Sequence, residues 1–115
     1  MRKIRYTPDA ADKLRMISKN VTLQYGKKKG EDVIRKTTQT IRGLSIYPEM
    51  GPSVESLWDI PSDYRYIYVS RNYIFYKIEQ DYIEIINIYN EKEDFIWSLF
   101  GIDTIPQETL DYWKE

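Results

Sequence analysis

Residues 64–89 read YRYIYVSRNYIFYKIEQDYIEIINIY, and this stretch decides the fold. Apolar side chains recur at about every second position in three runs that begin at Tyr64, Asn72 and Tyr82, and β-branched and aromatic residues dominate each run. The two gaps between the runs have the length of hairpin turns, so the stretch is predicted to form an antiparallel meander of three strands. The side chains expected to face the helices are Ile67, Val69, Ile74, Tyr76, Ile78 and alternate isoleucines of the third run.

An amphipathic helix is predicted upstream, over about residues 8–25. Thr7 has the side chain of an N-cap, Pro8 suits the first helical position, and Asp9 is favourable near the positive end of the helix dipole. Apolar residues then recur at spacings of three and four, and Gly26 ends the helix.

A second helix is predicted from about Glu31, and Pro48 ends it. Its inner stripe is expected to consist of Ile34, Thr37, Ile41 and Leu44. Residues 27–30, three lysines and a glycine, are predicted to form a cationic turn between the helices. Two helices joined so closely are most simply antiparallel neighbours.

The predicted element order is β-α-α-β-β-β, because residues 2–6 suit a short first strand. This order places an N-terminal αα-hairpin on one face of a small antiparallel sheet, so the fold class is α+β. The long connection 48–63 contains Leu57 and Trp58, which are expected to tuck back onto the body.

The end of the chain is predicted to be an addition to one domain. An apolar patch over 95–100 stops at Gly101, and a short C-terminal helix is expected from about Thr104. We therefore assign residues 1–101 to the domain and 102–115 to a C-terminal extension.

The composition excludes several function classes. The chain has 115 residues, 42% of them hydrophobic and 30% charged, as in an ordinary globular domain, and no apolar run approaches the roughly 18 residues that a membrane span needs. Cysteine and histidine are both missing, which excludes a disulfide scaffold, a thiolate metal site and histidine-based catalysis. No metal or cofactor is expected, and a cytoplasmic location is expected because no apolar signal segment follows Met1.

The net charge of −1 conceals an asymmetry between the two parts of the chain. Residues 1–42 carry a net charge of +8, and residues 43–115 carry −9. One interpretation is a basic face that meets a polyanion or an acidic peptide, and the other is that the two parts attract each other within the fold.

The chain resembles the RelE/ParE superfamily of bacterial type II toxins, also called plasmid-stabilisation proteins. Three segments carry the resemblance: residues 4–10, residues 44–51 and, most strongly, residues 65–94. The resemblance implies a toxin that causes growth inhibition and is neutralised by an antitoxin from the same operon, with operator DNA bound only through that antitoxin. Some members cleave mRNA in the ribosome, and ParE-like members inhibit DNA gyrase without cutting nucleic acid.

The catalytic residues of the mRNA-cleaving relatives are largely missing. Those relatives place an arginine where this chain has Tyr73. They place a second cation just past the last strand, and Lys92 stands there in this chain. They also have a Tyr or a His-Tyr pair near the C-terminus, whereas the nearest positions here hold Glu91, Lys92 and Ser98. Phosphodiester cleavage needs cations and proton-transfer groups, so whether the chain is an enzyme stays open. The candidates that remain for such chemistry are Arg65, Arg71, Tyr89 and Lys92.

Two surfaces are predicted to bind other macromolecules. An apolar surface suits an antitoxin segment or a target, and it is expected to consist of Tyr64, Tyr66, Tyr68, Phe95, Trp97, Leu99 and Phe100. A basic patch is expected at Lys27, Lys28 and Lys29.

Three functions follow from the resemblance and the residues. The first is a ParE-like toxin that binds and inhibits a target such as gyrase. The second is a RelE-like, ribosome-dependent mRNA endoribonuclease, and the third is a degenerate, non-toxic member that only binds its antitoxin.

Overall fold

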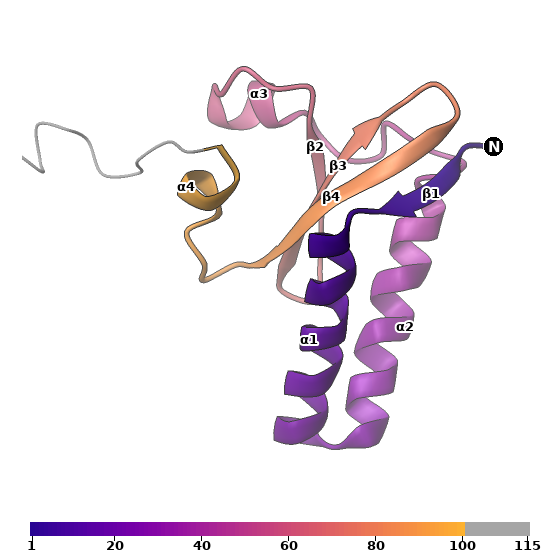
Figure 1. The fold of residues 1–115 in the computed structure, drawn as a ribbon, viewed down its shortest axis with the longest axis vertical. Helices are drawn as coiled ribbons and strands as arrows, with labels where there is room; N and C mark the ends of the chain where they lie inside the picture. Colours follow the sequence, from indigo (N-terminus) through magenta and orange to yellow (C-terminus); the bar gives the residue numbers. More distant parts are fainter. Residues whose placement is uncertain (101–115) are drawn as a thin grey trace, which may run out of the picture.

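The computed structural model describes residues 1–100, apart from the side chain of Trp97. It contains β1 (Lys3–Tyr6), α1 (Pro8–Tyr25), α2 (Lys27–Gly43), α3 (Val54–Trp58), β2 (Arg65–Val69), β3 (Asn72–Ile78), β4 (Tyr82–Asn90) and α4 (Phe95–Phe100) (Figure 1). The α+β class and the predicted element order are confirmed, and the short helices α3 and α4 are elements that the sequence analysis did not predict. The C-terminal extension and the helix expected from Thr104 lie outside the described residues. Within residues 1–100, no helix is long and apolar enough to cross a membrane.

The four strands form one sheet in the order β1-β4-β3-β2. The β2, β3 and β4 strands pair antiparallel, as the meander predicts. The β1 strand instead pairs parallel with β4, so the sheet is mixed and the prediction of a wholly antiparallel sheet is wrong. The β2–β3 turn is a two-residue hairpin in which Ser70 (φ 52°) and Arg71 (φ 65°) are both left-handed, the backbone of a type I′ turn. The carbonyl of Ser70 accepts a hydrogen bond of 2.9 Å from the side chain of the buried Asn72.

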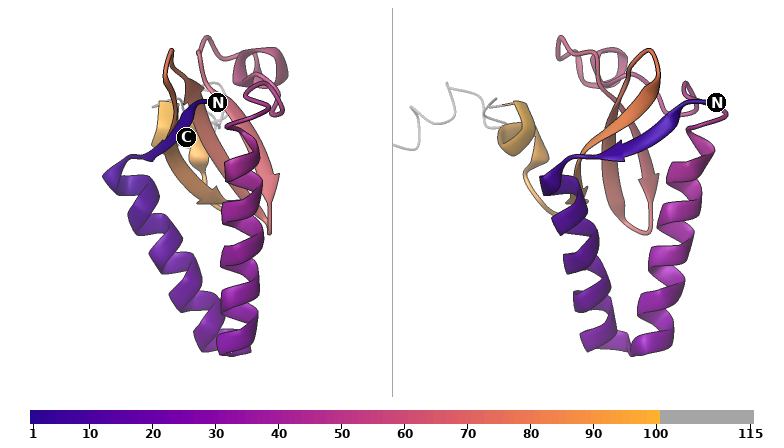
Figure 2. Two further views of the ribbon diagram at one scale, coloured as in Figure 1. Left: turned by 90° about the vertical axis from the view of Figure 1, so that its right-hand side faces the viewer. Right: turned by 45° about the vertical axis from the view of Figure 1, so that its right-hand side comes forward.

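Helices α1 and α2 cover one face of the sheet and extend past its end (Figures 1 and 2). The core beneath them contains Ala10, Ile41, Leu44, Ile67, Val69, Ile74, Tyr76, Ile83, Ile85 and Ile88. These residues include most of the side chains predicted to face the helices, and Ile78 is partly buried against them. The register between β3 and β4 shifts at Phe75 and Tyr76, which makes Ile85 and then Ile88 face the helices, in place of a strict alternation.

The joint between α1 and α2 is shorter than predicted. The prediction that residues 27–30 form a turn is wrong, because α2 begins at Lys27 and Gly26 alone makes the joint. Gly26 has φ 97°, a conformation that glycine adopts without strain. Gly30 is buried where the helices approach each other, since a Cβ there would lie 2.1 Å from Oγ1 of Thr22. The three lysines therefore form the first turn of a helix.

The start of α1 is fixed by Thr7, which caps the helix as predicted. Its hydroxyl oxygen accepts a hydrogen bond of 3.1 Å from the Ala10 amide, and its O–H donates one of 2.6 Å to the carbonyl of Ile86. The carbonyl lies beside the register shift of β4, so a single side chain connects the cap to the sheet.

The substitution Thr7→Ala is expected to lower the free energy of unfolding by about 1 to 2 kcal/mol, because it removes both hydrogen bonds. Thr40→Ala is the matched control, since the hydroxyl of Thr40 contacts only the Lys36 carbonyl of its own helix. Urea denaturation of both variants measures the difference. Equal losses in the two variants would contradict the proposed role of the cap.

Candidate interaction surfaces

The second face of the sheet carries an aromatic cluster. Its buried members are Val54, Ile60, Phe75 and Tyr89, and α3 and α4 pack against them. The Trp58 ring lies 4.8 Å from that of Tyr66 and 5.5 Å from that of Phe95. Trp58 thus tucks back onto the body as predicted, whereas Leu57 does not, because it points outward from the short helix α3 and is 53% exposed.

Most of the predicted apolar binding surface belongs to this cluster. Tyr64, Tyr66, Phe95, Leu99 and Phe100 are half-buried against it, and Phe100 lies 6.0 Å from Tyr64 between ring centroids. Only Tyr68 among the described members is largely open, at 49% exposed. Trp97 lies on α4, and its side chain is outside the described part of the structure. The sheet face that the sequence left open is thus covered by α3 and α4.

The four candidate catalytic residues do not form one site, because Arg71 and Lys92 line a common groove whereas Arg65 and Tyr89 lie outside it. Arg65 begins β2, and its guanidinium donates a hydrogen bond of 2.8 Å to the carbonyl of Gly51. Tyr89 is buried in the aromatic cluster, where its hydroxyl accepts a hydrogen bond from Asn87 and burial raises its pKa. Arg71 lies in the β2–β3 turn, beyond the whole of β2 from Arg65, a separation of roughly 16 Å at about 3.3 Å per residue. Lys92 is exposed in the loop after β4.

Arg71 instead joins a small polar group at the exposed end of the sheet. Its Nε lies 3.8 Å from the carboxylate of Glu91, which also accepts a hydrogen bond from the hydroxyl of Tyr68. The Glu91 carboxylate raises the pKa of Tyr68 above its ordinary value, because the hydrogen bond stabilises the protonated phenol. A phenol held protonated in this way is a hydrogen-bond donor at neutral pH.

The substitution Glu91→Gln is expected to lower the pKa of Tyr68 towards the ordinary value of a tyrosine, since the negative charge that opposes its ionisation is gone. The ring ¹³C signal of Tyr68, followed through an alkaline titration, measures the change. Glu93→Gln is the control and leaves the titration unchanged, because Glu93 pairs with Lys13 at 3.4 Å. If the pKa of Tyr68 is the same in the Glu91→Gln variant as in the unaltered protein, the contact between Tyr68 and Glu91 is refuted.

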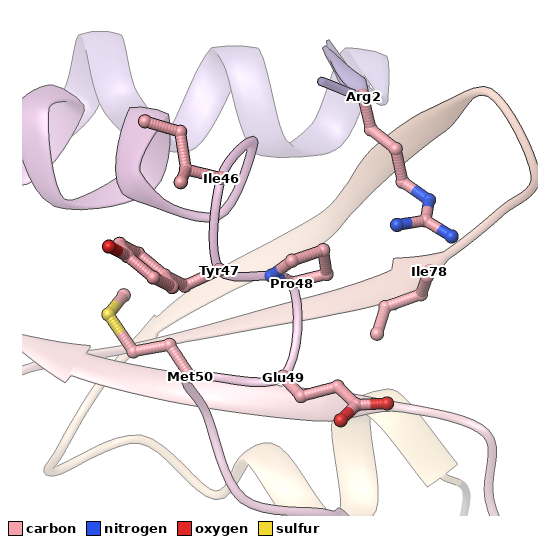
Figure 3. Close-up of a pocket in the computed structure, with 7 residues that line it drawn as sticks. All are labelled: Arg2, Ile46, Tyr47, Pro48, Glu49, Met50 and Ile78. Atoms are coloured by element: carbon pink, nitrogen blue, oxygen red, sulfur yellow. The ribbon is translucent and has the colours of Figure 1, made fainter.

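A patch of exposed apolar side chains follows α2, and sequence reasoning missed it. Ile46, Tyr47 and Met50, here called the loop patch, are 58%, 67% and 48% exposed. They surround a pocket of about 590 Å³ together with Arg2, whose Nε donates a hydrogen bond of 2.8 Å to the carbonyl of Glu79 (Figure 3). Three large apolar residues in an irregular segment were the signal available in the sequence. Such exposed groups of apolar residues mark interaction sites in soluble proteins.

The loop patch is held by a buried tyrosine beneath it. The hydroxyl of Tyr76 donates a hydrogen bond of 2.7 Å to the carbonyl of Pro48 and accepts one of 3.0 Å from the amide of Gly51. Burial raises the pKa of Tyr76, so the hydroxyl stays protonated and available as a donor. Arg65 adds its hydrogen bond to the same segment. Tyr76 itself lies in the core beneath the helices, as the strand pattern predicts.

A third surface is a groove of about 1030 Å³ between the projecting helices and the end of the sheet, here called the hairpin groove. Ile17 and Val21 of α1 and Val33 of α2 line it. The β2–β3 turn and the loop after β4 close the other side. Lys29 lines this groove, whereas Lys27 and Lys28 of the same basic patch do not.

Comparison with known proteins identifies a family and similar solved structures. A family model described as the ParE toxin of the type II toxin–antitoxin system parDE matches residues 4–95. A chain in a solved structure of the chromosomal ParDE toxin–antitoxin system from P. aeruginosa is similar in fold, with a TM-score of 0.66 at 17% sequence identity. The match covers 78% of this chain and 96% of that chain. A search of curated proteins finds no match.

Proposed function

The chain belongs to the ParE toxin family of type II toxin–antitoxin systems, with a cognate antitoxin as its partner, and from this premise we propose that it arrests growth by binding and inhibiting DNA gyrase. The observation that carries the proposal is the loop patch, an exposed apolar surface of a kind that docks a protein. Tyrosine and methionine are enriched in such interfaces. Arg65 and Tyr89 lie outside the groove that Arg71 and Lys92 line, and this separation of the candidate catalytic groups supports binding over bond cleavage.

The loop patch is proposed to contact the target. The antitoxin is proposed to contact Tyr68 and the exposed parts of the half-buried residues Tyr64, Tyr66, Phe95, Leu99 and Phe100. Tyr76 fixes the backbone on both sides of Met50 through its hydrogen bonds, so less backbone entropy is lost there when a partner covers the patch. The basic patch at Lys27, Lys28 and Lys29 is proposed to contact the DNA that gyrase holds. Any such phosphate contact weakens steeply as salt rises.

The proposal is tested by induced expression in bacterial cells. The unaltered chain is expected to arrest growth without new cuts in abundant transcripts, as read by primer extension, and co-expression of the antitoxin is expected to restore growth. Ribosome-dependent cuts would instead support the mRNA endoribonuclease, and normal growth would support the degenerate member.

A double substitution separates the two surfaces. Tyr47→Asp with Met50→Asp is expected to abolish growth arrest while antitoxin binding is retained, because charges in the loop patch oppose burial of that patch by the target. Leu57→Asp is the control, since Leu57 is 53% exposed on α3, outside the patch, and its variant is expected to remain toxic. Full toxicity of the double variant would exclude the loop patch as the target surface.

A further inference from the structure

The hairpin groove is lined by apolar side chains and by charged side chains, and only some of its cationic groups have an acidic partner. Ile17, Val21 and Val33 are each only partly buried, because the helices extend beyond the sheet that would otherwise cover them (Figure 2). A surface of this kind gains free energy when an apolar segment covers it.

The carboxylates that line the groove already have cationic partners. Asp32 pairs with Arg35, Glu91 with Arg71 at 3.8 Å, and Glu93 with Lys13 at 3.4 Å. Within residues 1–100, by contrast, no carboxylate lies within 4.0 Å of the ammonium groups of the groove residues Lys29 and Lys36.

Lys29, Val33 and Lys36 are spaced at i, i+4 and i+7 on α2, so they share one face of the helix. The two lysines therefore lie on either side of an apolar position in the groove. An occupant that matches this face combines apolar side chains with carboxylates. A strongly basic or purely polar segment does not match it.

We propose that residues 102–115 of this same chain occupy the hairpin groove. The segment reads IDTIPQETLDYWKE and carries four carboxylates against one lysine, a net charge of −3. Its apolar residues include Leu110 and Trp113, and the acids Glu108 and Asp111 alternate with them along the chain. The segment thus offers carboxylates to Lys29 and Lys36 and apolar side chains to the residues between them.

The connection permits this placement. Glu93 lines the groove, and Phe100, the last described residue, follows it by seven positions. The fourteen residues from 102 to 115 extend up to roughly 46 Å at about 3.3 Å per residue, longer than either helix of the hairpin. The segment then acts as an internal competitor for any acidic, apolar partner of the groove.

The test uses the full chain and spin labels on cysteines, which the chain lacks naturally. One label is placed at Thr109→Cys and the other at Asn20→Cys, an exposed position on the groove. Pulsed electron resonance is expected to give a single narrow, short distance between the labels. A label at Gln39→Cys, exposed on α2 outside the groove, is the geometric control and is expected to give a longer distance to Thr109→Cys.

Charge reversal then assigns the contact. The double variant Lys29→Glu with Lys36→Glu is expected to abolish the narrow short distance between the labels. The control variant Lys27→Glu with Lys28→Glu changes the net charge by the same amount, but outside the groove, and is expected to preserve that distance. Adding Glu108→Lys and Asp111→Lys to the first pair is expected to restore the short distance. A broad distribution in the unaltered background, or a short distance that survives reversal of Lys29 and Lys36, would overturn the proposal. Neither readout depends on toxicity or on gyrase.

Discussion

Replacing Gly51 with alanine is expected to destabilise the protein by about 3 kcal/mol, because the added methyl group meets backbone atoms of β2. A Cβ at this buried position would lie 2.1 Å from the carbonyl oxygen of Tyr66 and 2.8 Å from its carbonyl carbon. Both atoms belong to the backbone of β2, so a side-chain rotation cannot relieve the clash. The same methyl group would lie 2.9 Å from the hydroxyl of Tyr76, which positions the loop patch.

Gly43→Ala is the matched control for this prediction. Gly43 ends α2 with an ordinary φ, and its Cβ would meet only a side-chain atom of Met50 at 3.9 Å. Alanine is there expected to stabilise by roughly 0.5 kcal/mol, because it restricts the unfolded chain. Urea denaturation measures both changes, and a small loss for Gly51→Ala would show that the loop adapts to the added methyl group.

The substitution Phe75→Ala is expected to lower the free energy of unfolding by roughly 3 to 5 kcal/mol, because it empties the centre of the aromatic cluster. Phe75 is fully buried, and its ring lies 5.5 Å from that of Phe95 and 6.2 Å from that of Phe100, so it connects the sheet to α4. The ring of Trp58, on α3, lies 6.1 Å from the ring of Phe75. Loss of this one side chain thus loosens both short helices.

Denaturation followed by tryptophan fluorescence measures the effect of Phe75→Ala. Tyr25→Ala removes an aromatic ring that is 69% exposed, and its change is expected to stay within about 0.5 kcal/mol. A loss for Phe75→Ala no larger than that for Tyr25→Ala would mean that the cluster contributes little to the stability of the fold.

Strand periodicity and helix signals predicted most of the architecture. The alternation over residues 64–89 assigned the strands and their inward side chains, since apolar burial on one face enforces a period of two. Thr7 and Pro8 marked the start of α1 because capping depends on local geometry alone.

Features that depend on tertiary contacts did not show in the sequence. The prediction of a turn at residues 27–30 was wrong because the single left-handed Gly26 closes the hairpin, and lysines are good helix formers despite their unfavourable place near the positive end of the dipole. The register shift at Phe75 and Tyr76 lies beside the Ile86 carbonyl, which accepts a hydrogen bond from Thr7, 79 residues away in the chain.

Only part of the candidate surfaces could be predicted, because the rest also depends on tertiary contacts. An aromatic character of the second sheet face was evident from Tyr64, Tyr66 and Phe95, but the cover that α3 and α4 provide requires the full packing of the cluster. The loop patch was missed because exposure of Ile46, Tyr47 and Met50 depends on how Tyr76 anchors their segment.

The most direct measurement of the central claim is DNA supercoiling by purified gyrase in the presence of the purified protein. The account predicts that the unaltered chain inhibits supercoiling, that Tyr47→Asp with Met50→Asp does not, and that the antitoxin relieves the inhibition. Undiminished supercoiling at a saturating excess of the protein, with growth arrest still produced in cells, would contradict gyrase as the target.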